Sequence, residues 1–159
     1  MKIIYMHHAE RDRSSNAEWG TIERTFDDIT EMGQKQAELL ALRLKDLKIR
    51  AIISSPYLRC MHTAEIINKY HDLQIKEDSR FNEIQKNEEW TSFLKRNMEA
   101  IDDIVNVHSE DDTILCVTSG VNISAFICYT YNLEPSNDLP WSQAGDISPV
   151  IFDIKKKSR

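Results

Sequence analysis

The sequence contains 159 residues, of which 41% are hydrophobic and 29% are charged, and its formal net charge is −6. This composition is typical of one globular domain spanning 1–159. The acidic balance disfavours a nucleic-acid partner, because a phosphate backbone requires a basic surface. No apolar stretch is long enough to cross a membrane and no signal peptide is evident, so we expect a cytoplasmic protein without a membrane partner.

The first third of the chain predicts a strand, a long loop and a helix. The strand covers 2–6 and is followed by a polar loop over 11–28. Loops of this length in a compact domain are commonly functional. Thr30 is placed to cap a helix that runs over 31–47, and Gly33 near its start indicates that another part of the chain packs closely there.

The remainder of the chain continues the alternation of strands and helices. A strand over 50–54 precedes a helix for which we expect Ser55 as the N-cap and Pro56 as the first helical residue. The further predicted strands are 73–76, 113–118 and 148–154, and the predicted helices are 56–70, 88–107 and 121–131. The segment 134–145 is expected to be an irregular loop.

Strands that alternate with helices and are almost continuously apolar form a mostly parallel sheet that is covered on both faces. The predicted fold class is therefore α/β, a three-layer α/β/α sandwich with a mostly parallel central sheet. The three cysteines, Cys60, Cys116 and Cys128, have no metal-like spacing and are interpreted as small buried hydrophobic residues.

His8 is expected to end the first strand, at the edge of the sheet where ligands bind in α/β folds. A histidine there can accept a phosphoryl group, act as a general base, bind a metal, or simply form a hydrogen bond at the rim. The doublet of His7 and His8 suggests a metal less strongly, because adjacent strand residues point to opposite faces. A metal is therefore the weaker hypothesis at this point, and we expect no cofactor.

Arg59 lies near the start of the helix that follows the second strand. A helix N-terminus offers free N–H groups, and a guanidinium adds a bidentate fork that suits phosphate. The alternative is an arginine that points into solvent. With His8 at the same edge of the sheet, Arg59 favours phosphoryl chemistry.

Four segments together resemble the histidine phosphatase superfamily, which includes the cofactor-dependent phosphoglycerate mutases. The family's Arg-His-Gly at the end of the first strand reads His-His-Ala here, over 7–9. The segment 29–37 is similar to the family's Leu-Thr-x-x-Gly-x-x-Gln-Ala helix, and 54–65 matches its Ser-Pro-x-x-Arg-x-x-x-Thr-Ala-Glu block. Phe-Asn-Glu at 81–83 falls where the family has Leu-x-Glu, and the resemblance extends over the whole chain in order.

The resemblance implies a phosphatase that works without a metal. His8 would attack phosphorus and carry the phosphoryl group as a phosphohistidine, which water would then hydrolyse. Glu83 would protonate the leaving oxygen and later help to deprotonate water, while Arg59 would hold the phosphoryl oxygens. The expected substrate is a small phosphomonoester or a phosphorylated protein side chain. A mutase is disfavoured, because mutases use extra insertions to enclose their intermediate.

Two positions depart from the family pattern, and both weaken the phosphate pocket. His7 replaces the arginine that precedes the nucleophile, and Ser119 replaces a second histidine. Each lost donor in such a site costs ~3–4 kcal/mol of transition-state stabilisation. Partial compensation can come from a protonated His7, from the hydroxyl of Ser119, from backbone N–H groups of a helix that starts at Gly120, and from Arg11.

These departures keep a second function open, a weakly active or inactive domain that binds a phosphorylated ligand or a partner. The retention of His8, Arg59 and Glu83 opposes it, because a binding domain needs neither a nucleophile nor an acid. The loops 11–28, 85–90 and 134–145 are expected to determine the substrate. Trp19, Trp90 and Trp141 lie in or near these loops and are candidates for an apolar wall, although packing against its helix explains Trp90 better.

Overall fold

The computed structural model describes residues 1–139, 141–142 and 147–155, in which five strands form one sheet. In their order across the sheet, the strands are β3 (Ile75–Glu77), β2 (Ile49–Ser54), β4 (Thr113–Thr118), β1 (Lys2–His7) and β5 (Val150–Asp153). The first four run parallel to one another, and β5 pairs antiparallel with the outer side of β1. The predicted mostly parallel sheet is confirmed.

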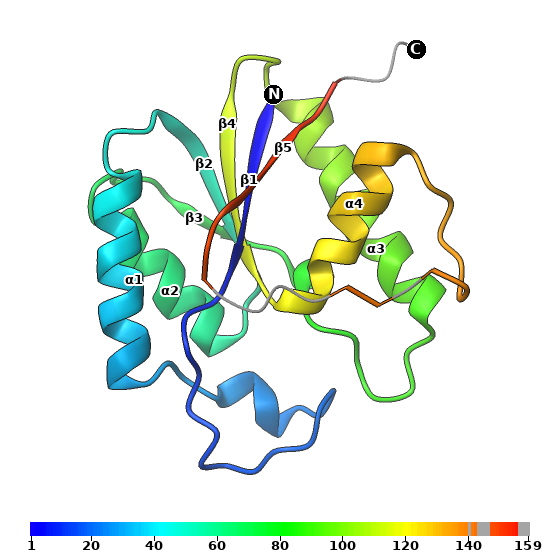
Figure 1. Ribbon diagram of the computed structural model, residues 1–159, viewed down its shortest axis with the longest axis horizontal. Coiled ribbons are helices and arrows are strands. Elements are labelled where there is room, and N and C mark those ends of the chain that lie inside the picture. Colours follow the sequence, from blue (N-terminus) through cyan, green and yellow to red (C-terminus); the bar gives the residue numbers. More distant parts are fainter. Residues whose placement is uncertain (140, 143–146, 156–159) are drawn as a thin grey trace.

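Helices cover both faces of this sheet (Figure 1). One face carries α1 (Glu31–Leu44) and α2 (Leu58–Asn68), and the other carries α3 (Trp90–Val107) and α4 (Ile123–Tyr131). None of the helices in the described part of the chain is long and apolar enough to span a membrane. The architecture is the predicted three-layer α/β/α sandwich.

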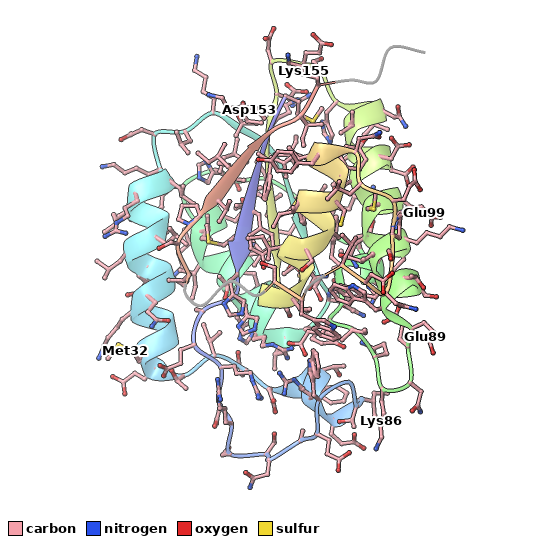
Figure 2. All side chains as sticks on the ribbon, turned by 45° about the vertical axis from the view of Figure 1, so that its right-hand side comes forward. Met32, Lys86, Glu89, Glu99, Asp153 and Lys155 are labelled. Carbon is pink, nitrogen blue, oxygen red and sulfur yellow. The ribbon has the colours of Figure 1, made fainter. Side chains whose placement is uncertain are left out.

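Strand β1 separates two hydrophobic cores because its side chains alternate between the faces of the sheet. Ile3 and Tyr5 pack into the core under α3 and α4, and Ile4 and Met6 pack into the core under α1 and α2. All four side chains are almost completely buried. Charged side chains such as that of Glu99 project from the outer surface (Figure 2). The three cysteines are buried and free, as predicted.

Most element boundaries agree with the predictions to within a few residues. Helix α1 ends at Leu44 rather than at residue 47, and β3 covers Ile75–Glu77 rather than 73–76. The loop 11–28 contains one short 3-10 helix, η1 (Glu23–Phe26), and a second, η2 (Ser79–Phe81), follows β3. Residues 140 and 143–146 of the predicted loop 134–145 lie outside the described residues.

The predicted start of α2 is wrong. The helix begins at Leu58, its N-cap is Tyr57, and Pro56 lies in the preceding turn. The hydroxyl of Ser55 donates to Oδ1 of Asn82 at 2.6 Å and accepts a long hydrogen bond, 3.4 Å, from the Tyr57 backbone N–H. Ser55 therefore ties the end of β2 to the segment after η2 instead of capping the helix.

The start of α1 is built around a close backbone contact. The side chain of Thr30 accepts from the Gly33 N–H at 2.9 Å, which is the predicted cap, and the Thr30 N–H donates to the Glu10 carbonyl at 2.9 Å. A Cβ added to Gly33 would collide with that same carbonyl oxygen. Glycine therefore lets the helix approach the chain just beyond β1, and this approach fixes the path of residues 8–10.

We expect Gly33→Ala to destabilise the protein, although the same change inside an ordinary helix is stabilising. The added methyl group must displace the backbone of Glu10, and overpacking of this kind costs ~1–3 kcal/mol. Urea unfolding of the variant measures the change in the free energy of unfolding. The exposed position Glu38 on the same helix provides the control, Glu38→Ala, which should change stability little. A Gly33→Ala variant as stable as the wild type would contradict the proposed contact.

Candidate functional site

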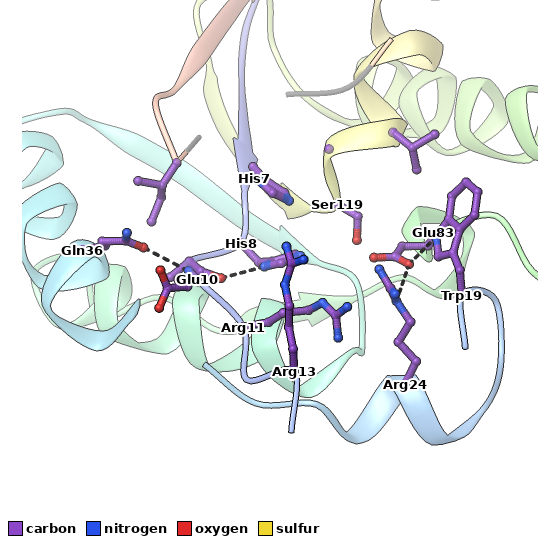
Figure 3. Close-up of a pocket in the computed structure, with 14 residues that line it drawn as sticks. His7, His8, Glu10, Arg11, Arg13, Trp19, Arg24, Gln36, Glu83 and Ser119 are labelled. Carbon is purple, nitrogen blue, oxygen red and sulfur yellow. Dashed lines mark hydrogen bonds and ion pairs between the residues drawn. The ribbon is translucent and has the colours of Figure 1, made fainter. Parts of the chain in front are cut away.

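The carboxyl ends of the parallel strands meet at one edge of the sheet, and the predicted site residues lie there. His8 follows β1 and donates its backbone N–H to the Thr118 carbonyl at the end of β4, at 2.9 Å. Ser119 comes next after β4, and Arg59 lies in the first turn of α2, shortly after β2. A cavity of about 550 Å³ opens at this edge (Figure 3). Side chains from β1, from the loop 11–28, from Glu83 and from Ser119 line it.

The imidazole of His8 is held in one tautomer. Its Nδ1 lies 2.7 Å from the Ala9 carbonyl oxygen, which can only accept, so Nδ1 carries the proton. Its Nε2 lies 3.1 Å from Nε of Arg59, which can only donate, so Nε2 presents its lone pair. Burial lowers the pKa of His8 well below its ordinary value, and the neighbouring charges of His7 and Arg59 lower it further. His8 is therefore neutral, with Nε2 as its nucleophilic atom.

Arg59 is fully buried, so the solvent-facing alternative is wrong. Besides the contact with His8, its guanidinium donates to Oε1 of Glu83 at 2.7 Å and to the Arg24 carbonyl at 2.7 Å. It also lies over the ring of Tyr57, 4.6 Å from the ring centroid. One arginine thus joins the histidine and the glutamate that the sequence singled out.

The carboxylate of Glu83 is buried among donors. Its Oε2 accepts from Nε1 of Trp19 at 2.8 Å and from Nε of Arg24 at 3.1 Å, and its Oε1 accepts from Arg59. Burial alone would raise the pKa of Glu83, but the positive charges of Arg59 and Arg24 outweigh it and leave the pKa below its ordinary value. Glu83 is therefore ionised in this arrangement.

A polar network behind the site fixes the backbone that carries Glu83. The guanidinium of Arg96, on α3, donates to the carbonyls of Arg80, Asn82 and Glu83 at 2.5–3.0 Å. The buried side chain of Asn122 donates to the Phe81 carbonyl at 3.1 Å. Because these donors come from different elements, the glutamate is positioned by the tertiary structure.

Ser119 and Gly120 both line the cavity, next to the end of β4. Ser119 is 2% exposed, and its hydroxyl makes no hydrogen bond of normal geometry to the described residues, although it lies close enough to Glu83 to help lower the pKa of that carboxyl. A buried hydroxyl without a partner is costly unless a ligand or water satisfies it. Gly120 begins a short 3-10 helix, η3 (Gly120–Asn122), which leads into α4.

The expectation that His7 and His8 point to opposite faces is wrong. Their ring centroids are 4.2 Å apart, because β1 ends at His7 and His8 already lies beyond the regular strand. Even so, no group of three histidine, cysteine, aspartate or glutamate side chains that could hold a metal ion occurs in the described part of the chain. Both rings line the cavity.

Arg11 also reaches the cavity, but it does not add an uncompensated charge. Its guanidinium forms an ion pair with the buried carboxylate of Asp27, which also accepts from the Ser15 hydroxyl at 2.6 Å. Arg13 lines the same cavity, and its side chain makes no ion pair with any residue that the structure describes (Figure 3). The unpaired cation of this loop is thus Arg13 rather than Arg11.

Sequence reasoning missed three residues of the site, namely Arg13, Arg24 and Asp27. All three belong to the loop 11–28, which was identified as functional but not resolved residue by residue. The available signal was three arginines in one loop of an acidic chain, at positions 11, 13 and 24. A solvated loop would show the same pattern, so the sequence alone could not assign these residues to the site.

Comparison with known proteins gives a family match over the first part of the chain. The family model of the histidine phosphatase superfamily (branch 1) matches residues 3–90. A 2,3-bisphosphoglycerate-dependent phosphoglycerate mutase from Thermoplasma acidophilum is 37% identical over 87 residues, which cover 53% of this chain and 42% of the relative. The match thus spans less than half of that relative's length.

Solved structures share the fold at low sequence identity. Bacillus stearothermophilus YhfR superposes with a TM-score of 0.78 and 20% identity over 98% of this chain and 92% of that chain. A phosphoserine phosphatase from Entamoeba histolytica in complex with phosphoserine gives a TM-score of 0.76 and 20% identity, over 98% and 91% of the two chains. With the family match over more than half of its length, the chain belongs to the histidine phosphatase superfamily.

Proposed function

We propose that the protein is a phosphatase that hydrolyses a phosphomonoester through a phosphohistidine on His8. The observation that carries this proposal is the chain of contacts from Nε2 of His8 through Arg59 to Glu83. His8 and Glu83 line the cavity, and the buried guanidinium of Arg59 contacts both of them. A neutral nucleophile, a carboxyl group and a cation that suits phosphoryl oxygens therefore lie together.

The reaction has two displacements. In the first, the lone pair on Nε2 of His8 forms a bond to phosphorus, the bond from phosphorus to the ester oxygen breaks, and protonated Glu83 gives its proton to that oxygen. In the second, water attacks phosphorus, Glu83 takes a proton from the water, and the bond between phosphorus and Nε2 breaks. Inorganic phosphate leaves, and His8 and Glu83 return to their starting forms.

The contacts of Arg59 require an exchange of partners when phosphate binds. Its Nε–H donates to the lone pair of His8 that must attack, and another of its N–H groups holds Glu83 in the ionised form. When these N–H groups move to phosphoryl oxygens, Nε2 is freed and Glu83 loses part of the positive field that lowers its pKa. Phosphate binding thus prepares both the nucleophile and the acid.

The comparisons support a small phosphorylated substrate. Structures with the same fold include a mycobacterial glucosyl-3-phosphoglycerate phosphatase and the phosphoserine phosphatase complex. A phosphorylated protein side chain is the second substrate class consistent with an open cavity at the surface. The mutase relative suggests an alternative outcome, in which the phosphoryl group is transferred between two positions of one substrate. Release of inorganic phosphate in an assay would exclude that outcome.

A specific observation favours a second function, namely binding of a phosphorylated ligand without turnover. Ser119 replaces a histidine of the family pattern, and Glu83 is clamped by two guanidinium groups in its ionised form. A domain that retains this clamp when phosphate binds would hold the ligand but could not protonate a leaving group. The variants below separate the two functions.

Removing the proposed nucleophile should abolish hydrolysis. We expect His8→Ala to lower kcat for p-nitrophenyl phosphate by at least ~10³-fold, because no phosphohistidine can form. The control is His108→Ala, at the end of α3 and close to the start of β4, which should retain wild-type activity. A His8→Ala variant that keeps its activity would exclude the proposed mechanism, and a wild type that binds phosphate without turnover would favour the binding domain.

The proposed acid should matter most for substrates with poor leaving groups. Glu83→Gln cannot donate a proton, so we expect kcat/KM for an alkyl phosphate to fall ~10²–10⁴-fold and kcat/KM for p-nitrophenyl phosphate to fall less than about tenfold. Because the pKa of Glu83 lies below its ordinary value, the wild-type rate on the alkyl ester should rise toward acidic pH, and the variant should lose this rise. Glu99→Gln, on the outer face of α3, is the control. Equal losses on both esters would refute the acid role.

His7 should make the rate depend on pH in a second way. An imidazole imitates the family's arginine only when it is protonated, so activity on p-nitrophenyl phosphate should fall at least about threefold as pH rises through neutrality. We expect His7→Arg to flatten this decrease, because a guanidinium keeps its charge. Rate profiles against pH for the two proteins test this, and identical profiles would show that His7 does not compensate for the missing arginine.

A further inference from the structure

The three tryptophans of the chain lie close together although they are far apart in the sequence, and one of them, Trp19, lines the cavity. The ring of Trp141 stacks on Trp90, with centroids 4.4 Å apart and an interplanar angle of 15°. Trp19 is also next to Trp141, with centroids 5.2 Å apart and an interplanar angle of 59°. Trp90 in turn stacks on Phe93 of α3. The rings form a continuous row that leads from the core of the protein to the cavity.

Packing accounts for only the inner end of this row. Trp90 is 6% exposed, whereas Trp19 is 44% and Trp141 is 53% exposed. Adjacent large aromatic surfaces that remain in solvent beside a cavity are typical of ligand sites, because their exposure has no structural benefit. Packing in the core therefore does not explain why Trp19 and Trp141 are placed together in solvent.

The row lies where a leaving group must lie. Nε1 of Trp19 donates to Oε2 of Glu83 at 2.8 Å, so the indole is directly beside the carboxyl group that is proposed to protonate the leaving oxygen. Figure 3 shows Trp19 and Glu83 together on the side of the cavity away from His8. In a displacement at phosphorus, the attacking and leaving atoms are roughly in line on opposite sides. A leaving group opposite His8 would thus be next to Trp19.

We propose that Trp19 and Trp141 form the subsite for the leaving group and that the preferred substrates are phosphomonoesters of aromatic alcohols. This inference rests on the proposed function only in taking His8 as the phosphate side of the cavity and Glu83 as the leaving-group side. Indole faces stack favourably on planar rings, in an offset or edge-to-face arrangement, and gain less from a short aliphatic group. The arginines of the cavity hold the phosphate, and the tryptophans select what is attached to it.

Two phosphonates test the subsite without any turnover, because a carbon–phosphorus bond is not hydrolysed by this chemistry. Isothermal titration calorimetry should give phenylphosphonate a dissociation constant roughly 3- to 10-fold lower than that of methylphosphonate. We expect Trp141→Ala to abolish this preference and to weaken methylphosphonate binding much less than phenylphosphonate binding, whereas Trp141→Phe should keep most of the preference. The control is Tyr70→Ala, which removes an exposed aromatic ring near the end of α2. This variant should keep the wild-type preference for phenylphosphonate.

The same variants give a kinetic readout. Trp141→Ala should raise KM for phenyl phosphate several-fold with little change in kcat, and should lower kcat/KM for glycerol phosphate much less than kcat/KM for phenyl phosphate. Equal affinities of the wild type for the two phosphonates, or a preference that survives Trp141→Ala, would overturn the subsite. A preference that depends on Trp141 in a protein without any turnover would overturn the phosphatase function and leave the subsite intact. Failure of both phosphonates to bind would overturn both proposals.

Discussion

The buried guanidinium of Arg59 is the constraint on which the rest of the site depends. A fully buried cation is tolerated only when it is neutralised and its N–H groups are satisfied, and removing a partner from such a pair costs about 3–5 kcal/mol. Arg59 meets this requirement with the carboxylate of Glu83, the carbonyl of Arg24 and the Nε2 atom of His8. Each of these partners comes from a different element, so the arginine fixes their relative positions.

In the proposed mechanism, the groups that hold Arg59 in place are the same groups that must release it when phosphate binds. A phosphoryl dianion offers oxygen acceptors and negative charge together, so it would replace Glu83 and His8 as partner of Arg59 more readily than a weaker anion would.

The positive charge of the cavity is distributed differently from the family pattern. The family places an arginine before the nucleophile and a histidine after the third core strand, where this chain has His7 and Ser119. Here the cations come from the loop 11–28, which supplies Arg13 and Arg24. A backbone hydrogen bond from the Lys86 N–H to the Gly20 carbonyl, 2.9 Å long, docks this loop on the segment that carries Glu83. The loop 11–28 thus supplies positive charge to a cavity whose strand ends lack the two cations of the family pattern.

The sequence by itself determined the layers, the mostly parallel sheet and the edge at which the site lies, because apolar periodicity and the polar residues that follow each strand are local properties. It also singled out His8, Arg59 and Glu83, through the resemblance to the family's motifs, and the structure brings these three side chains into contact. Only the tertiary structure decided that Ser55 binds Asn82 rather than capping α2, that Asp27 neutralises Arg11, and that Arg24 and Trp19 contact Glu83. Those pairings join residues from 16 to 64 positions apart. Which of several equivalent polar side chains meet depends on how a long loop folds back over the sheet, and hydrophobic periodicity does not encode that path.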